Sequence, residues 1–345
     1  MKVLFVAALN SISASGRQRL WALQQCGMDV TVINKDEYPS VFGRWAGRAA
    51  KLLKQPRLSS DTKALQSILI KVALEITPEL IWIEWPKEFQ PATLQYVKKL
   101  LPGSKIISFQ DDNPWGERSN DRWMWKDYFT CVPFFDWHIV KRESDIDHLT
   151  LLGANKMILW AHGMYSPVFY PDVSIEKKYP VSFVGTCMDQ RVEFIGHLLE
   201  KGIPIHVFGN RWDRRSDLPK RFPQYFHKAV VGDAYADVIR QSTVCLGLVS
   251  HSNQDEWTMR SYEVPACGVL LLAERTPAHE HLFEEEVTGI FFTNKEECAN
   301  KLLDLIQDEN KSRQMGTAAY KAFIEKKYTL TGRMNDLLHK HILIS

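Results

Sequence analysis

The amino-terminal part of the sequence alternates between short apolar runs and segments with helical spacing. Residues 2-KVLFVAAL-9 predict a buried strand, 16-GRQRLWALQQCG-27 predicts a helix ending at a glycine, and 28-MDVTVIN-34 predicts a second strand. Further strands are expected at 80-LIWIEW-85 and 105-KIISF-109, with a helical segment between them at 91–100. This alternation is typical of a parallel sheet with helices on both faces.

The same alternation restarts after 162-HGMYSPVFYPDVSIEKKYP-180, a segment rich in proline, tyrosine and charge that we interpret as a linker. Beyond it we expect strands at 181–185, 204–209, 243–249 and 269–274, and helices at 191–202, 234–242, about 256–267, 295–309 and 311–326. The pattern predicts an α/β fold of two Rossmann-like domains facing each other across a cleft. The first covers 1–165 plus a carboxy-terminal helix, 330–345, that crosses back to it, and the second covers 175–329.

Composition narrows the class of protein. A chain of 345 residues, 45% hydrophobic and 24% charged, has room for two cores, and its net charge of +2 gives no reason to expect a nucleic-acid partner. The six cysteines are widely spaced without a C-x-x-C pair, which predicts reduced thiols and a cytoplasmic setting. The first apolar run is short and leads into a helical pattern, so we expect no export signal, and no apolar stretch is long enough to predict a membrane-spanning helix.

The segment 41-VFGRWAGRAAKLLKQPR-57 places apolar side chains at helical spacing, with five basic side chains on or beside the other face. Two interpretations of this basic amphipathic helix remain open. It docks peripherally on an anionic membrane surface or a lipid-linked acceptor, or it packs its apolar face on its own domain.

Nucleotide-binding motifs of two common kinds are missing from the sequence. No G-x-G-x-x-G follows the first strand, which disfavours a dinucleotide reductase, and no G-x-x-x-x-G-K-[ST] is present, which excludes P-loop kinases and ATPases. Ligands of open parallel sheets bind outside the carboxyl ends of the strands, so the strand-to-helix loops hold the candidate site residues.

One such loop and its helix lie within 255-DEWTMRSYEVPACGVLLLAE-274. The exposed N–H groups at a helix N-terminus favour an anion such as a diphosphate, and Arg260, expected one turn into the helix, adds a fork of donors. Glu263 has the acceptor atoms to bind a vicinal diol such as a ribose. We therefore expect a nucleotide diphosphate here.

Residues from about 230 to 320 resemble the carboxy-terminal half of GT-B glycosyltransferases of group 1, and 260-RSYEVPACGVLLLAERTPAHEHLFEEEVTGIFF-292 is particularly similar to their spore-maturation-type branch. The family pattern is an acid, seven residues, then a glutamate before a small-residue turn. Glu263 with 264-VPACG-268 matches the second acid, and Asp255 stands at the first. The strand 181-VSFVG-185 followed by Arg191 resembles the family's V-G-R-x-x-x-x-K segment, with Thr186 where arginine is usual.

The resemblance implies roles for these residues. Asp255 would lie by the donor sugar as a catalytic residue, Glu263 would bind the ribose, and Arg191 would grip the diphosphate. Arg260 or Arg211 would replace the contact that Thr186 lacks, so the expected donor-binding set is Gly185, Thr186, Arg191, Arg211, Asn253, Arg260 and Glu263. Other interpretations stay open: Asp255 as a helix N-cap, with Glu256 acting in its place, and structural roles for Glu263 and Arg191.

The first domain would hold the acceptor. The loop 110-QDDNPWGERSNDRWMWKDYF-129 is rich in acids and aromatics, and Asp111 and Asp112 at the strand's carboxyl end are the preferred catalytic pair in this domain. Trp115 and Arg17 are the expected acceptor-binding residues, although aromatics of such a loop also serve to anchor it to the domain. His162 and Gly163 are weaker candidates, since a lone histidine is more often structural.

The function implied is transfer of a sugar, of the hexosyl type, from a nucleotide-diphosphate sugar to a glycan, a lipid-linked glycan or another cell-envelope acceptor, with retention of configuration expected. No His, Cys and Asp cluster has metal-ligand spacing, so we expect no metal and no cofactor besides the nucleotide-sugar co-substrate. Two alternatives are a nucleotide-sugar epimerase or hydrolase and a non-catalytic nucleotide-sugar-binding protein.

Overall fold

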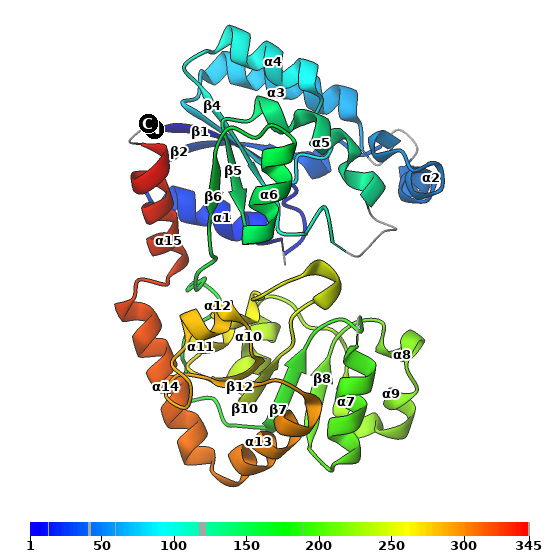
Figure 1. Ribbon diagram of the computed structural model, residues 1–345, viewed down its shortest axis with the longest axis vertical. Coiled ribbons are helices and arrows are strands. Elements are labelled where there is room, and N and C mark those ends of the chain that lie inside the picture. The colour runs from blue at the N-terminus through cyan, green and yellow to red at the C-terminus, as the bar shows by residue number, and fades with distance from the viewer. Residues whose placement is uncertain (13, 41–42, 59, 117–121, 189, 344–345) are drawn as a thin grey trace. The chain divides into compact units, whose positions relative to one another are not determined.

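The computed structural model describes residues 1–343 except 13, 41–42, 59, 117–121 and 189 (Figure 1). This part of the chain divides into two compact units. Unit 1 comprises Met1–Ala161 together with the residues from Met334 onward, and unit 2 comprises His162–Arg333. Each unit has its own parallel sheet covered by helices, so the expected α/β architecture of two Rossmann-like domains is confirmed.

The sheet of unit 1 has the strand order β2-β1-β3-β4-β5-β6, with all neighbours parallel. Long apolar runs form its centre: all five residues of β3 are buried, as are five of the six in β1. A strand buried on both faces needs helices on both sides, and the connections supply them. The strands are β1 (Lys2–Ala7), β2 (Asp29–Asn34), β3 (Leu80–Glu84), β4 (Lys105–Phe109), β5 (Trp137–Val140) and β6 (Met157–Leu159).

The helices of unit 1 connect these strands, and α3 and α4 lie side by side in Figure 1. Their bounds are α1 (Ser15–Gln25), α2 (Ala46–Leu53), α3 (Thr62–Ile76), α4 (Pro91–Leu100), α5 (Lys126–Cys131) and α6 (Glu143–Leu151). A last helix, α15 (Leu330–Leu337), starts in unit 2 and ends in unit 1, followed by the π-helical turn Leu338–Ile342.

The sheet of unit 2 has the strand order β12-β11-β10-β7-β8-β9, again parallel throughout. Its strands are β7 (Tyr179–Val184), β8 (Ile205–Phe208), β9 (Phe226–His227), β10 (Ser242–Gly247), β11 (Leu270–Glu274) and β12 (Ile290–Phe292). Its helices are α7 (Arg191–Glu200), α8 (Trp212–Arg215), α9 (Leu218–Arg221), α10 (Asp233–Arg240), α11 (Arg260–Ala266), α12 (Pro277–Leu282), α13 (Lys295–Gln307) and α14 (Glu309–Glu325).

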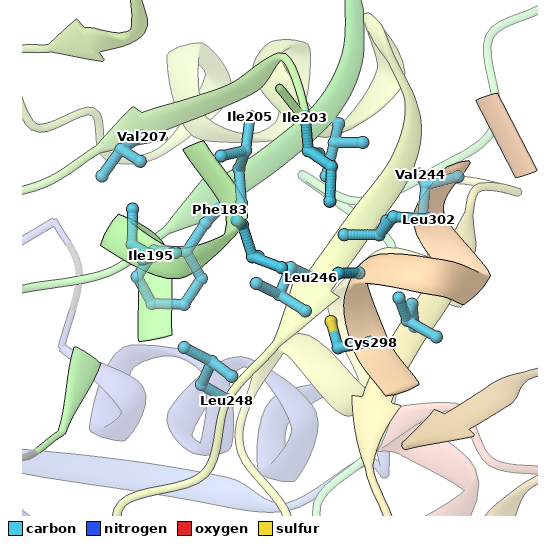
Figure 2. Close-up of a cluster of buried hydrophobic side chains, with 14 of the residues drawn as sticks. Phe183, Ile195, Ile203, Ile205, Val207, Val244, Leu246, Leu248, Cys298 and Leu302 are labelled. Carbon is cyan, nitrogen blue, oxygen red and sulfur yellow. The ribbon is translucent and has the colours of Figure 1, made fainter. Parts of the chain in front are cut away.

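A large hydrophobic core of unit 2 lies between this sheet and the helices α7 and α13 (Figure 2). Alternate residues of the strands, such as Val244 and Leu246 of β10, point into it with Phe183 of β7, because side chains of a strand alternate between its faces. Ile195 of α7 and Leu302 of α13 meet them from the helices. The core holds the central strands in register and so fixes where their carboxyl ends lie.

Several elements differ from the sequence-based expectations. Strands β5 and β6 and helix α3 were not predicted. Neither β5 nor β6 has a long apolar run, because β5 is interrupted by His138 and β6 has only three residues. In the folded unit the Nδ1 atom of His138 lies 2.6 Å from the Ser108 hydroxyl. Helix α3 had a signal that was missed, since the Asp61 side chain caps it by accepting from the Ala64 N–H.

Two segments were assigned wrongly. The supposed linker belongs to unit 2, where Met164 exchanges backbone hydrogen bonds with Tyr328 and Leu330 at 2.9 Å each. The basic segment forms a 3-10 turn at Gly43–Trp45 and then α2, which ends at Leu53 because the backbone of Lys54 is left-handed with a φ of 51°. Val41 and Phe42, which were expected on its apolar face, lie outside the described residues.

The packing of α13 in the core of unit 2 predicts which of its leucines stabilise the unit. Leu302 is fully buried, whereas its neighbour Leu303 on α13 is 39% exposed. Replacing Leu302 by alanine is expected to lower the free energy of unfolding of unit 2 by about 2–5 kcal/mol, because it leaves a cavity in the core. Leu303→Ala is the matched control and should cost less than about 1 kcal/mol. Denaturant titration measures both, and equal losses would contradict the packing described.

Candidate functional site

The carboxyl ends of β7 and β10 lie side by side at one edge of the sheet of unit 2, because the two strands pair in parallel. The chain leaves this edge at residues 185–188 after β7, at 209–211 after β8 and at 248–256 after β10. These three loops carry Gly185, Thr186, Arg211 and Asn253, whereas Arg191 begins α7 and both Arg260 and Glu263 are on α11. The structure thus brings the expected residues to one edge of one sheet.

Two glycines let the loops after β7 and β8 come unusually close. The Gly185 N–H donates to the Phe208 carbonyl at 2.9 Å, and the indole N–H of Trp212 donates to the Gly185 carbonyl at 2.9 Å. A side chain at Gly209 would place its Cβ 1.9 Å from the Gly185 oxygen. Only glycine fits there, and the close approach holds the backbone of the loop after β7 in place.

Arg191 and Arg260 reach the end of β7 from different helices. Arg260 donates from Nη1 to the Val184 carbonyl at 2.7 Å, and Arg191 donates to the Thr186 carbonyl at 3.0 Å and to the Leu248 carbonyl at 3.3 Å. Both guanidinium groups lie over the Phe183 ring, at 5.4 Å for Arg191 and 5.7 Å for Arg260. Two positive charges are therefore held at one strand end.

Arg260 occupies a different helical position from the one expected. It is the first residue of α11 and does not lie one turn into the helix, because the chain before it, 254–259, is not helical. Its Nε is buried and has no hydrogen-bond partner among the described residues.

Glu263 of α11 is 6% exposed and accepts a hydrogen bond of 2.7 Å from the Tyr235 hydroxyl of α10. Burial raises the pKa of Glu263 to about 7, although the Tyr235 hydrogen bond and the charge of Arg260 act in the opposite direction. Burial, with the neighbouring Glu263 charge, also raises the pKa of Tyr235. The carboxyl group is thus poised to titrate near neutral pH, in the manner common at functional sites.

Asp255 lies in the loop between β10 and α11. Its carboxylate accepts a hydrogen bond of 3.0 Å from the Asn253 side-chain amide, and its own N–H donates to the Ser250 carbonyl at 3.0 Å. The alternative that Asp255 caps α11 is wrong, because Met259 stands at the N-cap position. Asn253, expected to contact the donor, is 5% exposed and orients Asp255 in this structure.

Two pockets open at the same edge of unit 2. One of about 780 Å³ lies at the ends of β8 and β9 and includes Arg211, whose backbone has the left-handed φ of 70°, together with Trp212 and His227. The other, of about 310 Å³, lies at the ends of β10, β11 and β12 and includes Arg191 and Glu274. Among the described residues no group of three or more His, Cys, Asp or Glu side chains is placed to hold a metal ion.

The candidates of unit 1 have different surroundings from one another. Asp111 accepts from the Ser15 hydroxyl at 2.5 Å and pairs with Arg19 at 3.2 Å. Trp115 stacks on Phe129 and on His148, with ring centroids 5.5 and 4.8 Å away, which matches the interpretation of the aromatics as anchors of the loop. The loop residues 117–121 lie outside the described part of the chain.

The remaining candidates do not line a described pocket. Asp112 is half-buried next to Asp111, and Arg17 is bound to the Leu9 carbonyl at 2.9 Å. In unit 2, His162 is 2% exposed and packs edge-on against Tyr262. Gly163 lies against the backbone of Thr329 and Leu330, so it has a packing role within unit 2.

The sequence analysis missed Tyr235, the partner of Glu263, and the buried pair of Arg19 and Glu84. Tyr235 had no visible signal, because it is 28 positions from Glu263 and lies on another helix. The buried pair of Arg19 and Glu84 did have a signal in the sequence. Arg19 shares a helix face with Ala22 and Leu23, which is a core position, and Glu84 follows four apolar residues in the same strand. A charge at such a position demands a partner.

A family model described as glycosyl transferase-like matches residues 190–339. A comparison with curated proteins gives no match. Among solved structures, sucrose-phosphate synthase from Thermosynechococcus elongatus aligns over 100% of both chains with a TM-score of 0.69 and 13% identity.

Two further structures give similar values. HepE from Anabaena, solved with UDP-glucose, aligns over 100% of both chains with a TM-score of 0.64 and 11% identity. A glycosyltransferase from Rickettsia africae aligns over 100% of this chain and 98% of its own, with a TM-score of 0.65 and 13% identity. At these identities the likeness shows the fold, which is GT-B.

The pKa of Glu263 leads to a prediction about stability and pH. The pKa of Glu263 is about 7 in the folded protein and 4.5 ordinarily. Below pH 4.5 the side chain is protonated in both the folded and the unfolded state, so the raised pKa does not lower the free energy of unfolding. Above pH 7 it is ionised in both states, and the whole free-energy cost of burying the carboxylate is then present. The free energy of unfolding should therefore lose roughly 3 kcal/mol across that range through this group. In Glu263→Gln that loss disappears, because the amide does not titrate and its oxygen still accepts from Tyr235.

Urea unfolding at pH 4.5, 6 and 8 measures the effect as the difference between the wild type and Glu263→Gln. Glu325→Gln, which changes an exposed acid at the end of α14, is the control and should follow the wild type. Parallel pH curves for the wild type and Glu263→Gln would show that Glu263 does not titrate in this range.

Proposed function

We propose that the protein transfers a hexosyl unit from a nucleotide-diphosphate sugar to a glycan, a lipid-linked glycan or another cell-envelope acceptor, with unit 2 holding the donor. The observation that carries the proposal is the meeting of Arg191 and Arg260 at the end of β7, with the Glu263 carboxyl within the field of Arg260 on the same helix. The glycosyl transferase-like model supports it, since its match includes all three residues, and so does the fold shared with HepE, which was solved with UDP-glucose.

The charges of this edge suit a diphosphate. Arg191 and Arg260 are anchored through carbonyl oxygens and the Phe183 ring, so binding a phosphate would cost little side-chain entropy. Each guanidinium has five N–H donors, and the buried Nε of Arg260 has no described partner. We assign the diphosphate to these arginines and to Gly185 and Thr186, whose backbone lies beside them.

The ribose is assigned to Glu263. A buried carboxylate that already accepts from Tyr235 has further lone pairs for two hydroxyl groups, and hydrogen bonds from a diol would favour its ionised form. The base is assigned to the pocket at the ends of β8 and β9, where Arg211 and Trp212 lie.

The transferred sugar is assigned to the loop of Asp255. Asn253 holds the Asp255 carboxylate by a 3.0 Å hydrogen bond, which orients it without neutralising it. We propose that Asp255 contacts the donor sugar and that the reaction retains configuration, with the leaving phosphate assisting the acceptor hydroxyl. The arginines would take up the charge that develops on the leaving diphosphate, so we propose that transfer needs neither a metal ion nor a further cofactor.

Turnover separates this proposal from its alternatives. Purified protein is incubated with a panel of UDP-, GDP- and ADP-sugars, with and without neutral saccharide acceptors, and released nucleotide is measured. Release that depends on the acceptor is the expected result. Release of equal extent without acceptor would show a hydrolase, conversion of the sugar without release would show an epimerase, and saturable binding without either would show a non-catalytic protein.

The donor site itself is tested by affinity for the free nucleotide diphosphate. Glu263→Ala is expected to weaken binding by about 1–3 kcal/mol, because two charge-assisted hydrogen bonds to the diol are lost. Titration calorimetry at pH 8 measures the dissociation constant, with Glu325→Ala as the control for loss of an exposed acid. An unchanged dissociation constant in folded Glu263→Ala would refute the ribose assignment.

The second partner we propose is the anionic inner face of a membrane, contacted by α2. Leu52 is 83% exposed and Leu53 59%, next to the basic residues Lys51 and Lys54, while the inward face of α2 is made by alanines. The apolar leucines are thus not used for packing on unit 1. No helix among the described residues is long and apolar enough to cross a bilayer. A peripheral contact from the cytoplasmic side fits these features.

This contact predicts salt-sensitive binding to anionic vesicles. Replacing Leu52 and Leu53 together by serine is expected to weaken co-sedimentation at low salt at least about tenfold, because two side chains that would enter the bilayer interface are lost. Leu151→Ser is the control, since Leu151 on α6 is 84% exposed but has no basic cluster on its helix. Equal sedimentation of the double variant and the wild type would exclude α2 as the contact.

A further inference from the structure

The loop that carries Asp255 comprises residues 248–259 and connects the carboxyl end of β10 with α11. Strand β11 lies beside β10 and runs parallel to it, with Gly247 and Ala273 as register partners near the carboxyl ends. Residues 274–279, which finish β11 and start α12, therefore leave the sheet next to the Asp255 loop. We call them the supporting segment.

Hydrogen bonds inside the Asp255 loop fold its middle into a compact turn. The N–H groups of Asn253 and Asp255 both donate to the Ser250 carbonyl, at 3.2 and 3.0 Å, and the Asn253 side-chain amide binds the Asp255 carboxylate at 3.0 Å. Gln254 between them has a left-handed backbone with a φ of 53°. These bonds set the shape of the turn, but because they lie within it they do not fix its position on the sheet.

Glu274 of the supporting segment fixes the start of the loop. Its carboxylate accepts from the Val249 N–H at 3.0 Å and lies 2.7 Å from Nε2 of His251. The side chain is 18% exposed, and burial raises the pKa of Glu274, although His251 and the Val249 N–H act in the opposite direction. Two groups at the start of the loop are thus attached to one largely buried carboxylate of β11.

A second set of hydrogen bonds holds the end of the loop. The Thr276 hydroxyl donates to the Glu256 carbonyl at 2.6 Å. The Ser261 hydroxyl lies 2.8 Å from Nε2 of His279, and both residues are 1% exposed. The Thr258 N–H donates to the same Ser261 oxygen at 3.1 Å. The supporting segment therefore contacts the chain on both sides of the turn that holds the candidate catalytic acid.

The donors and acceptors around His279 have only one possible arrangement. The Glu274 carbonyl can only accept, so Nδ1 of His279, which is 2.7 Å away, carries a proton. Burial lowers the pKa of His279, although the hydrogen bond to the Glu274 carbonyl acts in the opposite direction, so the imidazole is neutral at neutral pH. Its Nε2 then accepts from the Ser261 O–H, and the Ser261 oxygen accepts from the Thr258 N–H.

We propose that Glu274 and the pair of Ser261 and His279 are positioning residues, which hold the Asp255 loop where its carboxylate meets the donor sugar. The effect on transfer rests on the proposed function, whereas the attachment of the loop does not. Asp255 lies between the two attached ends, so loss of either attachment displaces it. Transfer depends steeply on such placement, whereas binding of the diphosphate by the arginines does not depend on this loop position.

Variants of Glu274 separate its acceptor oxygen from its charge. Glu274→Gln keeps an oxygen that can accept from the Val249 N–H, whereas Glu274→Met has a similar length and no such acceptor, and both lack the charge. With a donor from the panel of UDP-, GDP- and ADP-sugars, kcat is expected to fall at least about tenfold in Glu274→Met and to stay within about threefold of the wild type in Glu274→Gln. The dissociation constant for the free nucleotide diphosphate should stay within about threefold in both.

Glu297→Met is the matched control for these variants. The Glu297 carboxylate also accepts from a backbone N–H, that of Thr293 at 2.8 Å, but Glu297 belongs to α13 and has no bond to the Asp255 loop among the described contacts. Its kcat should equal that of the wild type.

The Ser261 hydroxyl tests the second attachment. Ser261→Ala leaves the Thr258 N–H without its acceptor and Nε2 of His279 without its donor, so kcat is expected to fall at least about tenfold while the affinity for the nucleotide diphosphate is kept. Ser312→Ala is the control, because it removes an equally buried hydroxyl, which donates to the Leu305 carbonyl at 3.2 Å, from a different helix.

Amide hydrogen exchange gives a readout that needs no substrate. The Val249 amide is expected to exchange at least about tenfold faster in Glu274→Met than in the wild type, and the Thr258 amide should do the same in Ser261→Ala, because each N–H loses its acceptor. Glu274→Gln and both control variants should keep the wild-type rates. Heteronuclear NMR resolves the single amides, and the same spectra show that the rest of the unit stays folded.

Three results would overturn the proposal: wild-type exchange of the Val249 amide in folded Glu274→Met, wild-type kcat in both folded Glu274→Met and Ser261→Ala, or an equal loss of kcat in Glu274→Gln and Glu274→Met. The last would show that the charge of Glu274 acts on the substrate itself.

This proposal and the proposed function fail separately. Faster exchange in the variants, without turnover of any nucleotide sugar by the wild type, would keep the attachment of the loop and remove the transferase. Turnover by the wild type, with unchanged exchange and kcat in the variants, would do the reverse.

Discussion

The chemistry of unit 2 depends on the parallel pairing of β7 with β10. Val181 and Val244 are register partners in the buried middle of the two strands, and because both strands run in the same direction their carboxyl ends emerge next to each other. Arg191 can then bind carbonyl oxygens after both strands, and Arg260 can reach the end of β7 from α11. An antiparallel pair would send one of these ends to the far edge of the sheet and separate the two arginines.

Both units keep ionisable groups buried at the same kind of edge, at a cost in stability. In unit 2 the burial of Glu263 raises its pKa to about 7, and in unit 1 burial raises the pKa of Glu84 even though Arg19 opposes the shift. A well-packed apolar residue at either position would leave the folded unit more stable. What these groups supply is a polar surface held in one geometry by hydrogen bonds, from Tyr235 to Glu263 in unit 2 and from Arg19 to Glu84 in unit 1.

The sheets and most of the helices were predictable from local pattern. Strands such as β1 and β3 contain continuous apolar runs because they are buried on both faces, and that property is visible in the local sequence. The stretch from Asp255 to Gly268 also stood out, because three acids and an arginine precede a small-residue turn and a buried strand. Short or polar elements such as β6 and β5 had no such signal, since their strand conformation comes from their neighbours in the sheet.

Local pattern was thus enough to establish an α/β chain of two parallel sheets and to point to the loops that follow their strands. It could not say which charges meet. Arg19 lies 65 positions from Glu84 and 92 from Asp111, and Tyr235 lies 28 from Glu263, so each pairing is created by the order of strands in the sheet and by the helices packed on it. The left-handed backbone of Trp85, with a φ of 49°, was equally invisible, and so was the hydrogen bond that its carbonyl accepts from Lys35, 50 positions away. Periodicity reports the burial of a segment, whereas an electrostatic partner is a matter of position in space, and that position exists only once the whole unit has folded.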